Sequence, residues 1–263
     1  MNYLEDYYNN YDEEGRLLRR HGRVEYLTTM KYIHELLEED KSRRIIEIGA
    51  GTGRYSVTLA KEGYSVTAVE LVAHNLEILR SKLDGTEDME SCQGTALDLS
   101  AFADESFDLT LLLGPMYHLY NEADKMTALK EAVRVTKPGG HICVAYCMND
   151  SVVVQFAFIQ GKIRELLEKN MLTEDFHCLS KPEDLFEMVR VEEIEGLTAG
   201  LPVERERLVA TDGATGFIRD IVDAMDEETF RLWLEYHMKT CERRDLIGAT
   251  NHSLDILKKL EKK

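Results

Sequence analysis

The spacing of hydrophobic residues changes near residue 44. Residues 1–40 carry apolar side chains at intervals of three or four, which predicts an N-terminal helical segment. From Arg44 onward, short apolar runs alternate with amphipathic stretches, a pattern typical of strands and helices around a parallel sheet. We expect strands at 44–49, 65–71, 89–94, 107–113 and 140–147, and helices near 54–62, 74–83 and 122–136.

The pattern is less regular after Met148. The stretch 151–170 predicts an inserted helix, 181–189 another helix, and 191–197 an alternating strand. Residues 203–249 are interpreted as a second, mostly helical insertion, and 251–259 as a closing strand. The chain therefore predicts one α/β core with additions.

Charge disfavours one class of partner. Acidic residues outnumber basic ones 49 to 32, which gives a net charge of −17 and repels phosphate backbones. A local basic cluster nevertheless lies near the N-terminus and leaves a tRNA partner open; it comprises Arg16, Arg19, Arg20 and Arg23.

Neither a membrane span nor a metal is expected. No apolar run approaches the roughly 20 residues that a spanning helix needs, and the acidic, tyrosine-rich N-terminus is unlike a secretory signal. The five cysteines form no C-x-x-C pair, and their odd number argues against a disulfide framework. We therefore expect a soluble cytoplasmic protein with reduced thiols and no zinc.

A glycine-rich loop follows the first predicted strand in "IIEIGAGTGRY". Between a strand and a helix, such a loop offers free backbone N–H groups and lets a ligand approach closely, although it can also merely close a tight bend. A dinucleotide loop would need a third glycine at position 54, after Gly49 and Gly51. Arg54 stands there instead.

The spacing Glu47-x-Gly49-x-Gly51-x-Gly53 resembles motif I of the class I S-adenosylmethionine (SAM) methyltransferases. The resemblance runs from about 44 to 148 and is to the branch that includes ubiquinone and menaquinone methyltransferases. It implies a doubly wound, Rossmann-like, mostly parallel α/β sheet of seven strands. It further implies an N-terminal helical lid at 1–40, a SAM-binding core at 41–148, and acceptor-side insertions at 149–180 and 203–249.

The resemblance also implies a cofactor site at the carboxyl ends of the strands. Glu70 ends the second strand, where the family binds the ribose hydroxyls, and the segment 95–98 flanks the adenine. Glu47 either contacts the ligand or caps the glycine loop. The implied cofactor-binding residues are Arg23, Glu47, Gly49, Gly51, Gly53, Glu70, Leu71, Thr95, Ala96, Leu97, Asp98 and Leu113.

The substrate side is expected beyond the fourth strand, in "LLLGPMYHLY". Tyr117 and His118 are the catalytic candidates: His118 could accept a proton or bind the cofactor's carboxylate end, and Tyr117 could shape the pocket, although both could simply pack on the core. Arg23 matches a family arginine that meets the cofactor's carboxylate. Three N-terminal tyrosines are candidates for lining the acceptor site: Tyr7, Tyr8 and Tyr11.

The implied reaction moves a methyl group from SAM to an O, N or C atom of a small metabolite and leaves S-adenosylhomocysteine. Three alternatives remain open: a tRNA acceptor, a nicotinamide-dependent oxidoreductase, and a SAM-binding protein without catalysis.

Overall fold

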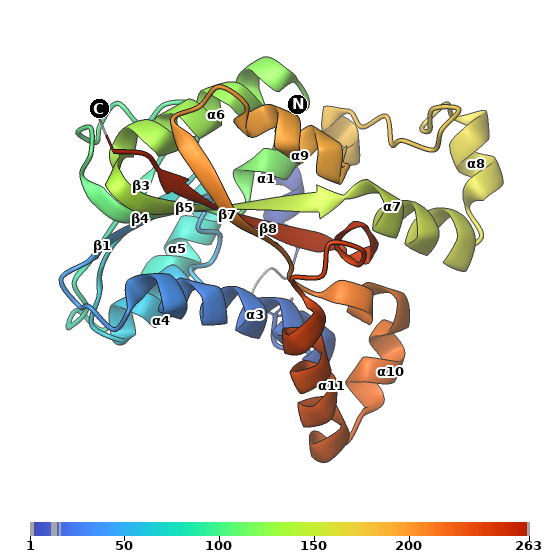
Figure 1. Cartoon of the computed structure of the whole chain (residues 1–263), viewed down its shortest axis with the longest axis horizontal. Coiled ribbons are helices and arrows are strands. Elements are labelled where there is room, and N and C mark those ends of the chain that lie inside the picture. Colours follow the sequence, from blue (N-terminus) through green and yellow to red (C-terminus); the bar gives the residue numbers. More distant parts are fainter. Residues whose placement is uncertain (1–2, 12–14, 16, 262–263) are drawn as a thin grey trace.

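The computed structural model describes residues 3–11, 15 and 17–261, and so leaves Arg16 outside the described residues. Its centre is one sheet with the strand order β3-β2-β1-β4-β5-β8-β7, to which the short β6 adds beside the end of β5 (Figure 1). All pairings are parallel except those of β8, which runs antiparallel to both β5 and β7. The strands are β1 (Arg44–Ile48), β2 (Ser65–Glu70), β3 (Met89–Gln93), β4 (Phe107–Leu112), β5 (Thr136–Met148), β6 (Met188–Val189), β7 (Val203–Ala210) and β8 (His252–Lys259).

Helices cover both faces of the sheet. In Figure 1, α3, α4 and α5 lie on one side, and α6 and α9 on the other. None of the helices in the described part of the chain is both long and apolar enough to cross a membrane. The α-helices are α1 (Tyr3–Tyr8), α3 (Arg20–Leu37), α4 (Ser56–Lys61), α5 (Ala73–Ser81), α6 (Glu122–Val135), α7 (Asn149–Val152), α8 (Ile163–Glu168), α9 (Val191–Thr198), α10 (Arg219–Ala224) and α11 (Glu227–Thr240).

The alternation within β1 divides the core into two layers. Ile46 and Ile48 pack with the α6 and α9 side, whereas Ile45 packs with α3 and α4. Because both faces of β1 are covered, the strand is an almost unbroken apolar run. Glu47 is the exception: its side chain is buried on the α4 side and belongs to the site described below.

The predicted doubly wound α/β fold and the first five strands are confirmed, but three expectations after Met148 are wrong. The segment 191–197 is helix α9, because Ile194 and Leu197 are buried three residues apart and Glu193 caps the N-terminus by accepting the N–H of Arg190. In 181–189, only a 3₁₀ turn (Pro182–Asp184) and β6 form.

The insertion expected at 203–249 begins with strand β7 rather than with a helix. The alternation of apolar and polar residues in β7 is hard to recognise in the sequence, because the charged side chain of Arg205 points to a partner within the sheet. The guanidinium donates two hydrogen bonds to the fully buried carboxylate of Asp255 on β8, with Nε–Oδ1 and Nη2–Oδ2 distances of 2.6 and 2.9 Å. The same guanidinium donates to the carbonyl of Ile194, so it also ties α9 to the edge of the sheet.

Replacing only Arg205 should destabilise the chain. Arg205→Leu leaves the Asp255 carboxyl buried without its partner, and we expect the free energy of unfolding in urea to fall by about 3 kcal/mol. The double variant Arg205→Leu/Asp255→Leu should recover most of this loss, since an apolar pair needs no compensation. A double variant less stable than Arg205→Leu would contradict this account.

Candidate functional site

The loop between β1 and α4 is built on three left-handed glycines. The φ angles of Gly49, Gly51 and Gly53 are 76°, 56° and 83°. A Cβ on Gly49 would lie 2.6 Å from Pro115 Cδ, and one on Gly53 would lie 2.6 Å from Leu79 Cγ. The two outer glycines therefore let the loop pack against the protein itself. The N–H of the middle one, Gly51, donates to the carboxylate of Glu70 at 2.7 Å.

Two acidic side chains accept hydrogen bonds from backbone N–H groups in and next to this loop. Glu70, the last residue of β2, accepts the N–H of Gly51 on one oxygen and that of Val72 on the other. Glu47 accepts the N–H of Ser56, the first residue of α4, at 2.8 Å, a contact that fits the capping role. Burial and the nearby Glu70 raise the pKa of Glu47 to about 8, despite the hydrogen bond from Ser56 that acts in the opposite direction.

The neighbouring edge of the sheet offers an apolar surface and a carboxylate. Leu71 follows Glu70, and its side chain is 39% exposed. Leu97 N–H donates to Thr95 Oγ1, and Ala96 between them is buried. Asp98 is exposed and accepts the N–H of Ser100, a hydrogen bond that lowers its pKa. The predicted cofactor residues from β2 and from 95–98 thus lie at one end of adjacent strands.

Arg23, which was predicted to meet the cofactor's carboxylate, and Arg54 of the glycine loop both lie over aromatic rings. The guanidinium of Arg23 stacks over the ring of Phe230 on α11, with Cζ 5.4 Å from the ring centre. That of Arg54, in the glycine loop itself, lies 4.7 Å above the ring of Tyr26. Arg54 Nε is buried, and no described residue accepts its hydrogen.

His118 is engaged by the protein on both ring nitrogens. Nδ1 donates to the carbonyl of Leu185 at 2.7 Å, so Nε2 is the acceptor for the hydroxyl of Tyr8 at 3.0 Å. Burial lowers the pKa of His118 to about 4, although the Leu185 carbonyl favours the protonated form. An imidazole that is weakly basic and hydrogen-bonded at both nitrogens is suited to anchoring α1. These contacts speak against a role as catalytic base.

Tyr117 and the N-terminal tyrosines do face a cavity. Its volume is about 980 Å³, and all four tyrosines (Tyr7, Tyr8, Tyr11 and Tyr117) line it. Tyr7 stacks on Tyr11 and meets Phe186 edge-on, so aromatic rings form one wall. A smaller cavity of about 20 Å³ lies between Tyr55, next to the glycine loop, and Leu113, Tyr117 and His252. Tyr117 and His252 line both cavities.

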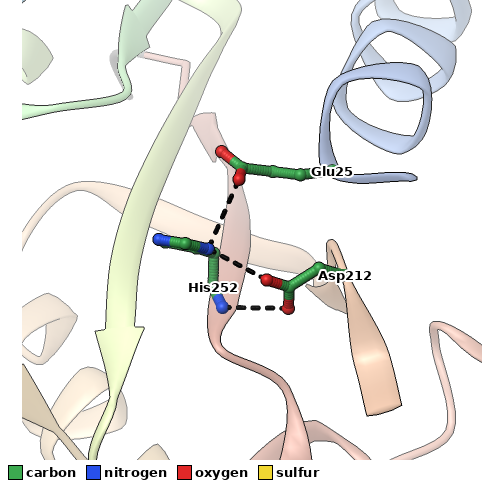
Figure 2. A group of neighbouring side chains, drawn as sticks. All are labelled: Glu25, Asp212 and His252. Carbon is green, nitrogen blue, oxygen red and sulfur yellow. Dashed lines mark hydrogen bonds and ion pairs between the residues drawn. The ribbon is translucent and has the colours of Figure 1, made fainter. Parts of the chain in front are cut away.

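Three residues that the sequence did not single out meet at this wall (Figure 2). His252 Nδ1 lies 3.0 Å from Asp212 Oδ2 and 3.4 Å from Glu25 Oε2. Burial opposes the protonated form of His252, but Glu25, Cys147 and Asp212 outweigh it and raise its pKa well above the usual value. The sequence offers one signal for Asp212 and His252, which is their position: Asp212 follows β7 and His252 begins β8. The incorrect helical interpretation of 203–210 concealed this signal.

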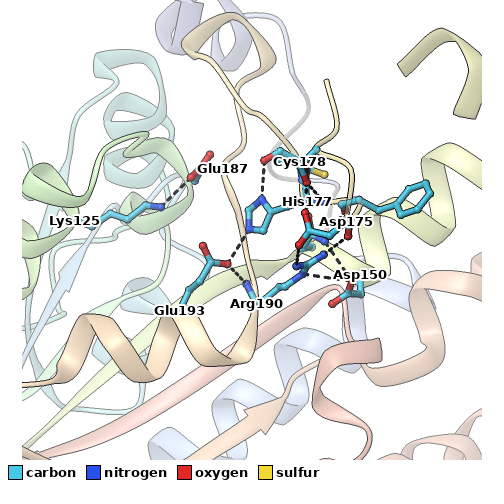
Figure 3. A network of polar contacts seen from close by, with 11 residues as sticks. Lys125, Asp150, Asp175, His177, Cys178, Glu187, Arg190 and Glu193 are labelled. Carbon is cyan, nitrogen blue, oxygen red and sulfur yellow. Dashed lines mark hydrogen bonds and ion pairs between the residues drawn. The ribbon is translucent and has the colours of Figure 1, made fainter. Parts of the chain in front are cut away.

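A second polar network stabilises the insertion at 149–180, which forms another wall of the large cavity (Figure 3). Arg190 binds the carboxylate of Asp175 through Nη1 at 2.6 Å and its carbonyl through Nη2. His177 Nε2 lies 2.8 Å from Glu193 Oε2. These contacts join the segment after α8 to the start of α9, and they have a structural role beside the cavity.

Comparisons with known proteins agree with this architecture. A family model described as a methyltransferase domain matches residues 46–144. A demethylmenaquinone methyltransferase from Clavibacter sepedonicus is 37% identical over 38% of this chain and 40% of its own length. One from Bacillus licheniformis is 27% identical over 60% of this chain and 65% of its own length. The chain thus spans about 40 to 65% of these curated relatives.

Solved structures extend the likeness to the whole fold. A SAM-dependent methyltransferase from Thermotoga maritima, described as a possible histamine N-methyltransferase, superposes with a TM-score of 0.60 at 24% identity over 98% of both chains. One from Methanosarcina mazei gives 0.59 at 18% identity over 88% of this chain and 98% of its own. Residues 46–144 thus match a methyltransferase domain, and the fold of the chain is that of SAM-dependent methyltransferases.

The buried Glu47 should make stability depend on pH. In the unfolded chain this carboxyl has its usual pKa, so between pH about 5 and 8 the unfolded state releases a proton that the folded state retains. Its stabilising contribution is therefore complete at low pH and lost as the pH rises towards 8. Glu47→Gln keeps an acceptor for Ser56 N–H and does not titrate.

We expect the stability of Glu47→Gln relative to the unmodified chain to rise by about 2–4 kcal/mol between pH 5 and 8. Urea denaturation at several pH values measures this difference. A difference that is constant over the range would show that Glu47 is already ionised when folded.

Proposed function

We propose that the chain is a SAM-dependent methyltransferase that binds its methyl donor at the carboxyl ends of β1, β2 and β4 and methylates a small molecule in the 980 Å³ cavity. The observation that carries this proposal is the contact between Glu70 and Gly51. It brings a buried carboxylate from the end of β2 against a glycine loop that opens a helix, the arrangement that suits a nucleoside at a parallel sheet.

The residues at this edge fit the nucleoside part of SAM. One carboxylate can accept from two ribose hydroxyls, and Glu70 has the position for it; the exposed side chain of Leu71 beside it provides an apolar surface for a base. Asp98 adds an exposed acceptor near the adenine side. When bound, SAM supplies a methyl group already activated on its sulfonium sulfur, so no nucleophile from the protein is required.

For the carboxylate end of SAM, Arg54 is a better candidate than Arg23. Arg54 belongs to the glycine loop, and its buried Nε has no acceptor among the described residues. An arginine in this position can bind a carboxylate through two parallel hydrogen bonds. Arg23 lies outside the glycine loop, and its guanidinium is directed to Phe230 on α11.

Methyl transfer is proposed at the small cavity between the two sides. Its lining joins Tyr55 and Leu113, next to the donor loops, to Tyr117 and His252, which also line the large cavity. Tyr117 donates its hydroxyl hydrogen to the carbonyl of Leu113 at 2.9 Å, which fixes its ring between donor and acceptor. We therefore assign Tyr117 to positioning of the acceptor, and His118 to holding α1 through Tyr8.

The cavity favours a small acceptor over tRNA. Its wall carries the aromatic rings of the N-terminal tyrosines, which suit a compact molecule. Two arginines of the basic cluster are engaged within the protein: Arg20 pairs with Glu227 at 2.9 Å, and Arg23 stacks on Phe230. These two side chains are therefore less available to a phosphate backbone. We further propose a cytoplasmic location, because all five cysteines are free thiols; cell fractionation tests it.

Substitutions at the donor site should weaken or abolish binding of S-adenosylhomocysteine, as measured by isothermal titration. Gly51→Arg introduces a side chain where the ligand must approach the backbone, and we expect no measurable binding. Glu70→Gln retains the size of the side chain but loses its charge and replaces one of the two accepting oxygens with an NH2 group, so the dissociation constant should rise about tenfold or more.

Glu77→Gln is the matched control, since it makes the same chemical change at an exposed position on α5 and should bind as the unmodified chain does. Equal binding by all variants, or no binding by the unmodified chain, would overturn the proposal. NADH tested in parallel would reveal an oxidoreductase. Binding of SAM without formation of S-adenosylhomocysteine, whichever pool of small metabolites is offered as acceptor, would favour the non-catalytic alternative.

A further inference from the structure

Three potential metal ligands come from separate parts of the chain. Glu25 lies on α3, Asp212 directly follows β7, and His252 is the first residue of β8. One ligand atom from each lies within 4.8 Å of the other two. Ligand atoms about 2.1 Å from a metal and at right angles lie about 3.0 Å apart. The separations of 3.0 and 3.4 Å from His252 Nδ1 to the two carboxylates are of this size.

The Asp212 carboxylate is fixed by contacts of its own. Oδ1 accepts from Thr250 Oγ1 at 2.5 Å, from Asn251 N–H at 2.8 Å and from His252 N–H at 3.1 Å. Oδ2 is thereby turned to His252 and Glu25 (Figure 2). Hydrogen bonds that orient a ligating carboxylate in this way are typical of metal sites, since they determine the geometry before the ion binds.

The three groups are also open on one side. The side chains of Glu25 and His252 retain 13% and 20% of their exposure, and all three residues line the 980 Å³ cavity. A site with three protein ligands and further positions open to a cavity is the arrangement of catalytic rather than structural metal centres.

We propose that Glu25, Asp212 and His252 bind one divalent transition-metal ion at the wall of the acceptor cavity. Two carboxylate oxygens and one imidazole nitrogen suit Mn²⁺, Fe²⁺ or Zn²⁺, whereas a site for Mg²⁺ alone would be built from oxygens. The ligands are distant in sequence, at positions 25, 212 and 252, which is why no metal-binding spacing is visible along the chain.

The site has a consequence that rests on the proposed function. An acceptor oxygen bound to the metal would lose its proton to solvent more readily than in water. Its lone pair would then form the C–O bond while the C–S bond breaks and its electrons pass to sulfur, giving neutral S-adenosylhomocysteine. The acceptor class would therefore be a hydroxyl compound able to reach a metal beside Tyr117.

Binding of Mn²⁺ alone tests the site without any acceptor. Electron paramagnetic resonance of free Mn²⁺ in the presence of the full chain should reveal one saturable site. The chain carries a net charge of −17, so weak adventitious binding elsewhere is expected and the variants are decisive. Glu25→Gln and His252→Gln should each weaken the saturable site more than about 100-fold.

Asp223→Asn provides the matched control. Asp223 lines the same cavity and pairs with His21 at 2.8 Å, but no second carboxylate of the described residues joins that pair. This variant should bind Mn²⁺ as the unmodified chain does. Absence of a saturable site, or equal loss in Asp223→Asn, would overturn the proposal and leave the cluster as an ion-paired histidine. Unfolding curves of each variant exclude loss of the fold.

The outcome can be separated from that of the proposed function. Gly51→Arg should lose S-adenosylhomocysteine and retain Mn²⁺, and Glu25→Gln should do the reverse. A chain that binds Mn²⁺ but never S-adenosylhomocysteine would refute the methyltransferase proposal and leave the metal site standing.

Discussion

The acceptor side depends on the reversed direction of β8. Parallel strands bring their carboxyl ends to one edge of a sheet, and a strand that runs the other way brings its first residue to that same edge. His252 is the first residue of β8 and pairs with Cys147 near the end of β5. On the other flank, β7 ends at Ala210, two residues before Asp212. His252 of β8 and Asp212 after β7 therefore meet at the wall of the cavity.

Much of the donor side could be predicted because its signals are local. The apolar run of β1, the three glycines and the terminal Glu70 follow one another within about one strand-helix unit, and each has a direct structural meaning. The structure brings these residues together as expected, with Glu70 bonded to Gly51. The alternative roles of Glu47 were not separable in the sequence, because only the packed structure shows that its partner is Ser56.

The acceptor side was less predictable because its signals are long-range. Arg205 made β7 look polar, yet its partner Asp255 is 50 residues away on the neighbouring strand. His118 seemed a suitable base by its place in the loop, but the carbonyl of Leu185 and the hydroxyl of Tyr8 occupy both nitrogens. Similarly, nothing local connects Glu25 with Asp212 and His252. Burial and tautomer are properties of the assembled fold, and neither is readable from residue type.

The N-terminal helix α1 contributes Tyr7 and Tyr8 to the wall of the large cavity. This helix has six residues and none of them is buried, whereas the sheet below it has fully buried strands. Segments with little buried surface open at far lower free energy than the whole domain unfolds. Release of α1 alone would therefore open this wall of the cavity with the glycine loop still intact. Under the function proposed above, acceptor and product would both depend on this opening, and its rate would set an upper limit on turnover.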